Sequence, residues 1–249
     1  MSVPGAALPA SRLLAALPRA ARDRFISGCD VIALEFEEVL ALPGAEIEHV
    51  YFPLDSYISQ LTPVAGPALE IALTGNEGML GLPVALGVRT SAVRAIVQGR
   101  GTALRMKARA FRGQLEGSDK LRLRMARYSF VSLTQIGHIA ACNRFHPVDQ
   151  RLARWLLMTA DRAHSLSFHV THAYLAYMLG VRRVGITLAA AKLQSIGLIN
   201  YSRGRITVID LPGLKRTACA CYQASLDTYD SVLGNGETGI AAFAAAGRE

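Results

Sequence analysis

The order of elements expected between His169 and Asp210 constrains the fold of this chain more than any other feature. Capping residues, turn glycines and alternating strand patterns follow one another there without a gap. Helix, tight turn, helix and hairpin in immediate succession are typical of a winged helix-turn-helix. The expected elements are a helix capped by Thr171 and ending at Leu179, a turn at Gly180 and Val181, a helix from Arg182 to Ser195 that stops before Gly197, and strands Ile199–Tyr201 and Arg205–Ile209.

The second of these helices has two distinct faces at about 100° per residue. One face is ordinary core: Ile186, Ala189, Ala190 and Leu193. The opposite face is small or apolar where a solvated helix would carry Lys and Glu: Val184, Thr187, Leu188 and Ala191. Such a face suits a DNA groove, where apolar groups meet thymine methyls and Arg contacts guanine or phosphate. The alternative is a buried helix in a larger all-α core, which the Arg-Gly-Arg hairpin that follows disfavours.

Candidate contacts to DNA fall into two groups. Residues expected to read bases or to position the recognition helix are Arg182, Arg183, Val184, Thr187 and Leu188. Residues expected to contact phosphates are His172, Lys192, Arg203 and Arg205.

Charge is distributed unevenly along the chain, whose net charge is +8. Residues 25–88 contain nine acids and no Lys or Arg, whereas residues 89–144 contain twelve basic residues and two acids. Residues 147–216 contain ten basic residues and three acids. The asymmetry indicates that only the second half of the chain meets a polyanion such as double-stranded DNA.

A length of 249 residues favours two domains, and a 51% hydrophobic composition can bury a substantial core. The longest uncharged apolar run, Met79–Val88, is too short for a bilayer and contains Pro83. The N-terminal stretch lacks a signal-peptide core and is expected to form a short amphipathic helix around residues 11–24. We therefore expect a cytoplasmic protein with no membrane contact.

Short strand-like segments broken by Gly and Pro fill the region from about Asp30 to Phe111. Many short strands at near-regular spacing predict a small β-barrel or jelly roll. With the helical second half, this gives an α+β fold class. The segments are Val31–Phe36, Val50–Phe52, Tyr57–Thr62, Leu69–Leu73, Ala92–Val97 and Gly101–Met106.

A long helix is expected from Ser118 to about Asn143, where turn residues almost vanish, and His146-Pro147 ends it. Its apolar and small positions form a narrow seam like that of a coiled coil: Leu121, Met125, Tyr128, Ser132, Gln135 and Ile139. This seam favours a homodimer axis, and the alternative is a helix packed on its own barrel. A further helix is expected from Val148 to about Ser165.

Four regions follow from these patterns. They are an N-terminal helix with a barrel sensor domain (1–117), a dimerisation or linker helix (118–146), a winged helix-turn-helix domain (147–225) and a loosely ordered tail (226–249), the loss of regular order beginning after Tyr222.

The cysteine and histidine pattern predicts no metal site, no cofactor and no enzyme. Metal binding or redox sensing by Cys219-x-Cys221 is the alternative, but the pair is isolated and lacks two further ligands. An iron–sulfur cluster needs three or four clustered thiolates. Only His49 lies in the barrel region, whereas metal-dependent barrel enzymes need several converging His and carboxylate ligands. No Gly-x-Ser-x-Gly turn is present.

The chain resembles bacterial transcription regulators of the Crp/Fnr family over roughly residues 13–222. The resemblance is carried by LAYMLGVRRVGITLAAAKLQSIGLI, and in the first half by VYFPLDSYISQLT and GNEGMLGLPVALG. It implies a cyclic-nucleotide-binding-like barrel, a homodimer and two recognition helices in successive major grooves of a pseudo-palindromic operator. It also places Arg183 at the family's guanine-reading arginine.

Two departures from the family pattern change what the resemblance implies. The position that matches the family's ribose-binding acid is Met79, and Thr90 stands directly before Ser91-Ala92 where an arginine would bind the cyclic phosphate. Because a thioether is a weak acceptor, cyclic AMP is not expected as the effector. One interpretation of this segment is an effector pocket lined by Met79, Leu80, Leu82 and Arg89. A second interpretation is a plain turn with no ligand role, and a third is signalling between proteins without a small ligand.

The sequence thus predicts a sequence-specific DNA-binding transcription regulator of the Crp/Fnr type that acts as a homodimer. RNA polymerase is a possible further partner, and the operator is expected to differ from that of the best-known members because Val184 and Leu188 replace their Glu and Arg. The alternative function is a small-molecule sensor or protein-interaction module that does not read DNA sequence.

Overall fold

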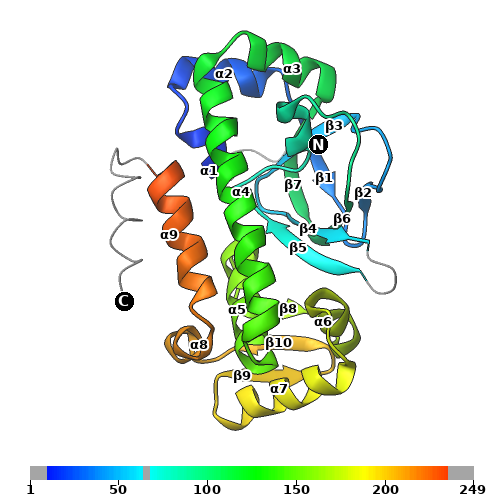
Figure 1. The fold of residues 1–249 in the computed structure, drawn as a ribbon, viewed down its shortest axis with the longest axis vertical. Helices are drawn as coiled ribbons and strands as arrows, with labels where there is room; N and C mark the ends of the chain where they lie inside the picture. The colour runs from blue at the N-terminus through cyan, green and yellow to red at the C-terminus, as the bar shows by residue number, and fades with distance from the viewer. Residues whose placement is uncertain (1–9, 64–67, 235–249) are drawn as a thin grey trace, which may run out of the picture.

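The computed structural model describes residues 10–63 and 68–234. A β-sheet domain lies at one end, the long helix α4 (Asp119–Phe145) runs along the molecule, and a helical domain with a small sheet lies at the other end (Figure 1). The expected α+β fold is confirmed in this order. None of the described helices combines the length and apolar character needed to cross a bilayer.

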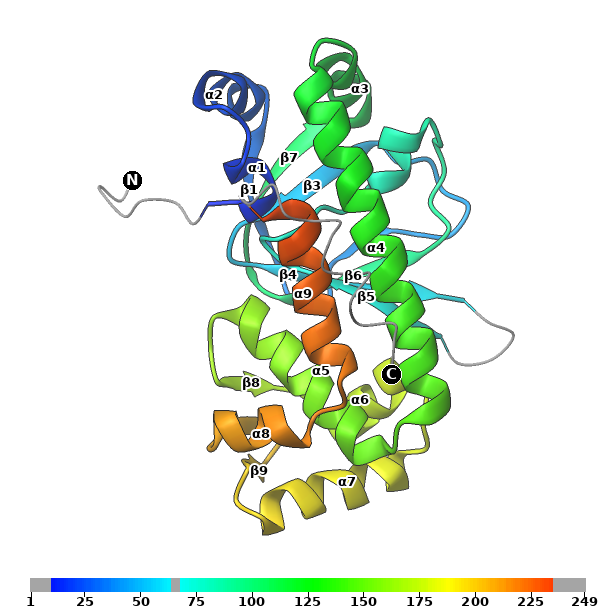
Figure 2. The ribbon, with the colours of Figure 1, turned by 60° about the vertical axis from the view of Figure 1, so that its left-hand side comes forward.

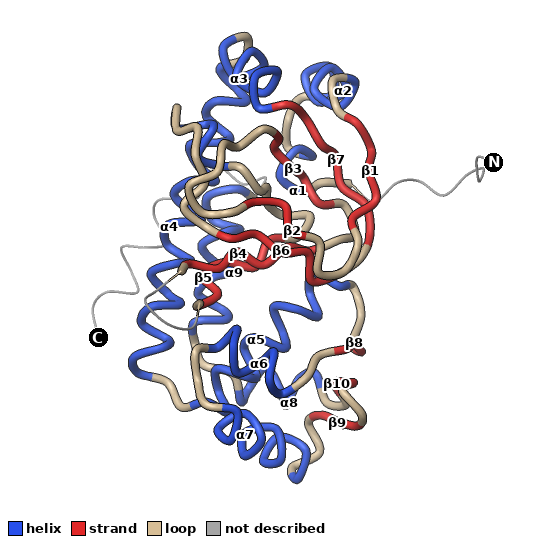
Figure 3. The backbone as a smooth tube through the Cα atoms, turned by 90° about the vertical axis from the view of Figure 1, so that its right-hand side faces the viewer, coloured by secondary structure: helices blue, strands red, loops and turns tan. Residues whose placement is uncertain are grey.

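The N-terminal domain contains two antiparallel sheets that face each other (Figure 3). One has the order β1-β7-β3 and the other the order β2-β6-β4-β5. The expected strands are all present, whereas the sequence patterns missed β2, whose three residues are too few to show an alternation. The strands are β1 (Asp30–Leu34), β2 (Val39–Ala41), β3 (His49–Pro53), β4 (Tyr57–Thr62), β5 (Leu69–Thr74), β6 (Arg94–Gly99) and β7 (Gly101–Lys107).

Three helices cover one end of this domain: α1 (Arg12–Ala15), α2 (Arg19–Ser27) and α3 (Ala108–Glu116). The single helix expected around residues 11–24 is two helices, because Pro18, the N-cap of α2, has an extended ψ of 139° that interrupts the helical backbone. Phe25, Phe52 and Phe111 pack edge to face beneath them, with ring centroids 5.3, 6.1 and 6.2 Å apart. This aromatic cluster fixes α2 and α3 to the sheet.

Helix α4 begins as expected, since the Ser118 hydroxyl accepts a hydrogen bond from Leu121 N, and it ends before His146 and Pro147. Its predicted seam does not face outward. Leu121, Met125 and Tyr128 are buried in the core of the chain's own barrel domain. The alternative of a helix packed on its own barrel therefore holds for this face.

A different face of α4 is apolar and exposed. The exposed fractions are 54% for Leu123, 52% for Phe130 and 69% for Leu133. Leu123 and Phe130 lie about 200° around the helix from Leu121 and Tyr128, on the side away from the barrel. We call these three residues the α4 stripe.

The C-terminal domain follows the order expected for a winged helix-turn-helix. A short strand, β8, was not expected; it adds to the hairpin and gives a sheet of order β8-β10-β9 (Figure 3). The elements are α5 (Val148–Ala163), β8 (Ser167–His169), α6 (His172–Leu179), α7 (Arg183–Ser195), β9 (Ile199–Ser202) and β10 (Arg205–Val208).

Two helices follow the hairpin, α8 (Leu211–Thr217) and α9 (Cys221–Leu233). The prediction of loose order after Tyr222 is wrong up to Leu233, and its remainder, residues 235–249, lies outside the described part. Helix α9 runs back beside α4 (Figure 2), with Tyr229 and Leu233 buried in the barrel core and Arg124 Nη1 donating to Leu233 O over 2.7 Å. The sequence pattern did not predict this helix, because its buried face contains only a few large apolar side chains among small residues.

The barrel and the C-terminal domain share one hydrophobic core, which includes Leu61 and Leu73 from the sheet and Leu152 and Leu156 from α5. A buried carboxylate lies at this junction. Glu70 on β5 accepts from Trp155 Nε1 over 2.9 Å, from Gln98 Nε2 over 3.4 Å and from the Ser59 hydroxyl. Burial raises the pKa of Glu70 to about 7, although the hydrogen bonds from Ser59 and Trp155 oppose the shift.

We predict that the junction weakens as pH rises through the Glu70 transition. A carboxyl whose pKa is raised on folding stabilises the folded state below its ordinary pKa of 4.5, and this contribution is lost as pH rises toward about 7. The free energy of unfolding, measured in denaturant across this range, should therefore fall more steeply for the wild-type chain than for Glu70→Gln. Parallel pH profiles for the two proteins would contradict the assignment.

Candidate nucleic-acid interface and ligand cavity

Local capping fixes the geometry of the helix-turn-helix. The Thr171 hydroxyl accepts from Tyr174 N over 3.2 Å at the start of α6. Gly180 follows with a φ of +61°, and a Cβ there would lie 2.8 Å from Leu69 Cδ1, so glycine suits both the turn and the close approach to β5. Helix α7 then lies at the end of the molecule farthest from the barrel sheets (Figure 1).

The outward face of α7 is exposed as the sequence predicted. Val184 is 61% exposed and Leu188 67% exposed, while the opposite face is buried in the core of the domain. Arg182, Arg183 and Thr187 are also exposed, and the first turn of α7 contains no acidic residue. The positive end of the helix dipole and two guanidinium groups thus lie together on one surface.

His172 has a different environment from the one expected of a free phosphate ligand. Its ring stacks on Tyr201 with centroids 4.3 Å apart, and its Nδ1 lies 3.1 Å from the Thr187 hydroxyl oxygen. Burial, and then the charge of Arg183, lower the pKa of His172, which favours the neutral ring. His172 therefore joins α6, α7 and the hairpin.

Lys192 also has a protein partner. Its ammonium pairs with the Asp149 carboxylate on α5, and the hydrogen bond from Lys192 lowers the pKa of Asp149. Any contact between Lys192 and a phosphate must compete with this ion pair.

The hairpin carries the two other candidate phosphate ligands. Arg203 lies in the turn between β9 and β10 with a φ of +49°, followed by Gly204 with a φ of +76°. Both Arg203 and Arg205 are exposed, and Tyr201 N donates to Gln194 Oε1 over 2.7 Å, which fixes the hairpin to α7. The position of the basic turn relative to the exposed face of α7 is therefore fixed by this hydrogen bond.

A cavity of about 310 Å³ lies between the barrel and α4. Met79, Leu80 and Leu82 line it, whereas Arg89 is exposed and is not among the lining residues. Helix α4 forms one wall of the cavity, which was not predicted from the sequence. Tyr128, Ser132 and Gln135 line it, and their spacing along the supposed dimer seam was the signal for this role.

The lining of the cavity does not suit an anion. It includes Glu46, Glu48 and His49, and the lining residues in the described part of the chain include neither Lys nor Arg. A cyclic phosphate would find carboxylates where it needs a guanidinium.

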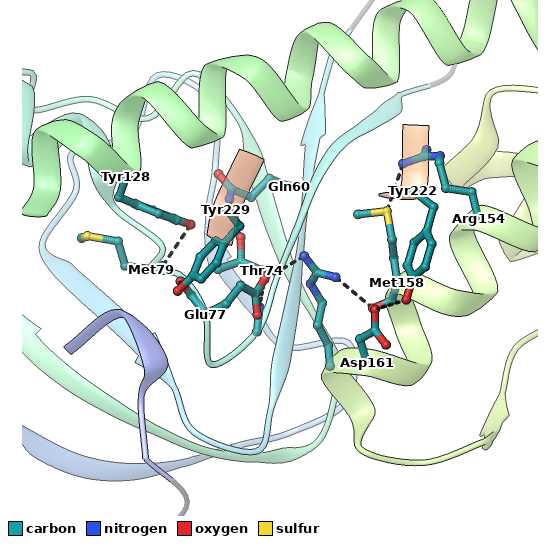
Figure 4. A network of polar contacts seen from close by, with 12 residues as sticks. Gln60, Thr74, Glu77, Met79, Tyr128, Arg154, Met158, Asp161, Tyr222 and Tyr229 are labelled. Carbon is teal, nitrogen blue, oxygen red and sulfur yellow. Dashed lines mark hydrogen bonds and ion pairs between the residues drawn. The ribbon is translucent and has the colours of Figure 1, made fainter. Parts of the chain in front are cut away.

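The loop beside the cavity is connected to three helices (Figure 4). The Tyr128 hydroxyl on α4 lies 3.2 Å from Met79 N, and the Tyr229 hydroxyl on α9 donates to Glu77 O over 3.0 Å. The Glu77 carboxylate pairs with Arg162 on α5 over 2.7 Å, where the side chains are 15% and 8% exposed. The loop is therefore tied by an ion pair to α5, the first helix of the C-terminal domain.

The assumption that Cys219 and Cys221 form an isolated pair is wrong. Cys142 and His146, at the end of α4, lie beside them. Sequence spacing could not reveal this, because more than seventy residues separate the two pairs and the packing of α9 on α4 brings them together.

Comparisons with known proteins agree with this arrangement. Residues 150–217 match the model of the Crp-like helix-turn-helix domain. None of the curated proteins compared with the chain matches it significantly.

Solved structures with a similar fold cover both domains. A putative transcriptional regulator of the crp/fnr family from Eubacterium rectale has a TM-score of 0.64 at 16% identity, with 81% of this chain and 94% of that chain aligned. FixK2 from Bradyrhizobium japonicum has a TM-score of 0.66 at 13% identity, with 77% and 98% aligned. The c-di-GMP responsive global regulator CLP of Xanthomonas campestris has a TM-score of 0.64 at 14% identity, with 78% and 100% aligned.

We predict that Arg162→Ala lowers the free energy of unfolding by about 3 kcal/mol, because it leaves the Glu77 carboxylate buried without its cation. Arg19→Ala is the control. Arg19 forms an exposed i,i+4 pair with Asp23, whose loss should cost less than about 1 kcal/mol. Urea unfolding followed by the fluorescence of the single tryptophan, Trp155, measures both. Equal losses in the two variants would contradict the role of the buried pair.

Proposed function

We propose that this chain is a DNA-binding transcription regulator of the Crp/Fnr type that reads a pseudo-palindromic operator as a homodimer, since residues 150–217 match the Crp-like helix-turn-helix domain. The observation that carries the proposal is the exposed face of α7, where Arg182 and Arg183 precede the exposed Val184 and Leu188 beside a basic hairpin turn. Apolar side chains at 61% and 67% exposure have no partner in the described part of the chain, and thymine methyl groups in a major groove would supply one.

Within this proposal Arg183 reads a base and Arg182 positions the helix on the backbone. Arg183 begins α7, where the N-terminal turn of a recognition helix meets base edges. Its guanidinium can donate two hydrogen bonds to guanine O6 and N7. Val184, Thr187 and Leu188 continue the same face into the groove.

Arg203 and Arg205 are the phosphate ligands that the geometry favours. Both are exposed, and neither forms an ion pair in the described residues. His172 and Lys192, which the sequence suggested for the same role, have protein partners in Thr187 and Asp149. We therefore assign these two a supporting role at the interface.

We further propose that the α4 stripe forms the dimer contact. Leu123, Phe130 and Leu133 repeat at spacings of seven and three, the pattern of a two-helix seam, and face away from the chain's own barrel. Two copies joined there would present two recognition helices, as half-sites about 34 Å apart require.

The cavity is proposed as an effector site for a small, largely apolar molecule without an anionic group. Its volume is at the lower end of the range for ligand sites, and carboxylates line part of it. The hydrogen bond between Met79 N and the Tyr128 hydroxyl joins the loop beside the cavity to α4. A bound molecule that moves Met79 would therefore also move α4, which bears the α4 stripe.

The alternative function is a sensor or interaction module that contacts a protein partner through the C-terminal domain. The two functions differ in a selection from fragmented genomic DNA, because only a sequence reader enriches one palindrome above background. Enrichment is expected. A selected pool no different from the input would contradict the proposed function.

We predict that Arg183→Ala costs about 1–3 kcal/mol on the selected site and relaxes the preference for one base. Arg203→Ala should instead weaken binding to all sequences together and reduce the salt slope by about one. Binding-site selection and salt titration with both variants separate the two roles. Unchanged discrimination by Arg183→Ala would remove its assignment as a base reader.

We predict that Leu133→Glu converts the dimer to a monomer, because two carboxylates would face each other in an apolar seam. Sedimentation velocity measures the change, and affinity for the full palindrome should fall with it. Val31→Glu is the control, since Val31 is an exposed apolar residue on β1, away from the stripe. A Leu133→Glu protein that remains dimeric would exclude the stripe as the contact.

We predict that cyclic AMP and cyclic GMP produce no binding heat at micromolar concentration in titration calorimetry. The reason is the absence of any Lys or Arg from the described lining, together with Met79 at the position of the family's acid. Saturable heat from either nucleotide would overturn our description of the cavity.

A further inference from the structure

Four possible metal ligands converge at the end of α4, outside both the DNA-binding face and the cavity. Cys142 and His146 come from α4 and its C-cap, one helical turn apart; Cys219 precedes α9 and Cys221 begins it. Their ligand atoms all lie within 4.8 Å of one another. Cys142 Sγ and Cys219 Sγ are 3.4 Å apart, and Cys221 Sγ lies 3.6 Å from His146 Nδ1.

These separations match a tetrahedral site. Two thiolates bound to one Zn²⁺ at about 2.3 Å lie about 3.8 Å apart in tetrahedral geometry, and a thiolate and an imidazole lie slightly closer. The cluster is also shielded from water, with exposed fractions of 0% for Cys142, 5% for Cys219 and 9% for Cys221. Three thiols and one imidazole form one of the ordinary ligand sets of structural zinc.

The surroundings supply the charge that such a site needs. Three thiolates and one Zn²⁺ carry a net charge of −1. Arg154 is 4% exposed, and its Nη1 donates a hydrogen bond to the thioether sulfur of Met158 over 3.0 Å. Arg151 is 7% exposed and donates to Asn143 Oδ1 over 2.7 Å and to Leu179 O.

Neither of these two guanidinium groups lies within 4.0 Å of a carboxylate in the described part of the chain, although Arg154 interacts at longer range with Glu70. Buried cations without an anionic partner are costly. Both arginines lie within electrostatic range of the cluster. A negatively charged metal–thiolate centre would therefore stabilise them.

We propose that Cys142, His146, Cys219 and Cys221 bind one structural Zn²⁺. The ion would join the end of α4 to the start of α9, at the point where the chain enters the DNA-binding domain through Pro147. Its role would be to fasten the C-terminal helix along α4 and to hold the junction of α4 and α5.

The geometry favours this over two other uses of the cysteines. A Cys142–Cys219 disulfide would use two of the four groups and leave the imidazole and Cys221 without a role. An iron–sulfur cluster distributes its thiolate ligands over two or more irons, so these thiolates are farther from one another than the ligands of a single ion. The four ligand atoms here all lie within 4.8 Å of one another, which is too close for such a cluster.

Metal analysis of the full-length chain tests the proposal. The chain is purified without a histidine tag, under reducing conditions, and dialysed; elemental analysis should then find about one zinc per chain. Modification of the thiols with a mercurial should release the zinc, which a metallochromic dye detects. Cobalt added to the metal-free chain should give the visible bands and thiolate charge transfer of a tetrahedral site.

Single substitutions locate the ion. Cys142→Ser and Cys219→Ser should lose most of the zinc and show a lower melting temperature, since metal affinity contributes to folding. Cys29→Ser is the matched control, because Cys29 is the remaining cysteine and lies outside the cluster; it should keep full zinc content. If a cysteine variant fails to fold, His146→Gln, at the half-buried helix cap, provides the same comparison.

Three results would overturn the proposal. They are a reduced wild-type chain that binds neither zinc nor cobalt, a Cys142–Cys219 disulfide as the stable form of the chain isolated from cells, and the absorption spectrum of an iron–sulfur cluster. Zinc content is measured without DNA, so the result is independent of the proposed function.

Discussion

The packing of α4 against the barrel is the interaction on which the rest of the structure depends. Leu121, Met125 and Tyr128 bury one face of the helix in the barrel core, and α9 covers a second face. Burial of several large side chains contributes roughly 1.5–3 kcal/mol each, enough to hold the helix in one orientation. Because α4 is held in this orientation, the α4 stripe faces away from the barrel, and another face of the same helix forms one wall of the cavity.

The same helix contributes residues to three features: the cavity, the α4 stripe and the cluster of Cys and His residues. Its middle lines the cavity through Tyr128 and Ser132, its outer face carries the stripe, and its end carries Cys142 and His146 beside α9. The Glu77–Arg162 ion pair adds a second connection, from the loop beside the cavity to α5. The loop beside the cavity is therefore connected to the C-terminal domain in two ways, through α4 and through α5.

Buried charge distinguishes this junction from an ordinary apolar interface. Glu70, Glu77 and Arg162 lie between the barrel and the C-terminal domain, each with a specific partner. Removing one partner from such a pair costs far more than an exposed ion pair is worth. The relation of the two domains is consequently specific, and burial at this junction raises the pKa of Glu70 to about 7.

Local patterns in the sequence determined the helix-turn-helix. Thr171 as a cap, Gly180 in a left-handed turn and the two faces of α7 depend on contacts within a few residues, so their spacing predicts them. Most strands of the barrel were predictable for the same reason. The order of domains followed from these elements and from the charge asymmetry.

Tertiary structure decided what local spacing cannot express. Helix α4 has apolar residues on two faces, and only the position of the barrel determines which face is buried and which is free. Helix α9 lacked a strong pattern because small and polar residues form much of its buried face, and only its contacts with Arg124 and the barrel core show that this face is covered. The Cys and His cluster likewise exists only after α9 has packed on α4, since contact between ligands more than seventy residues apart is a property of the folded chain.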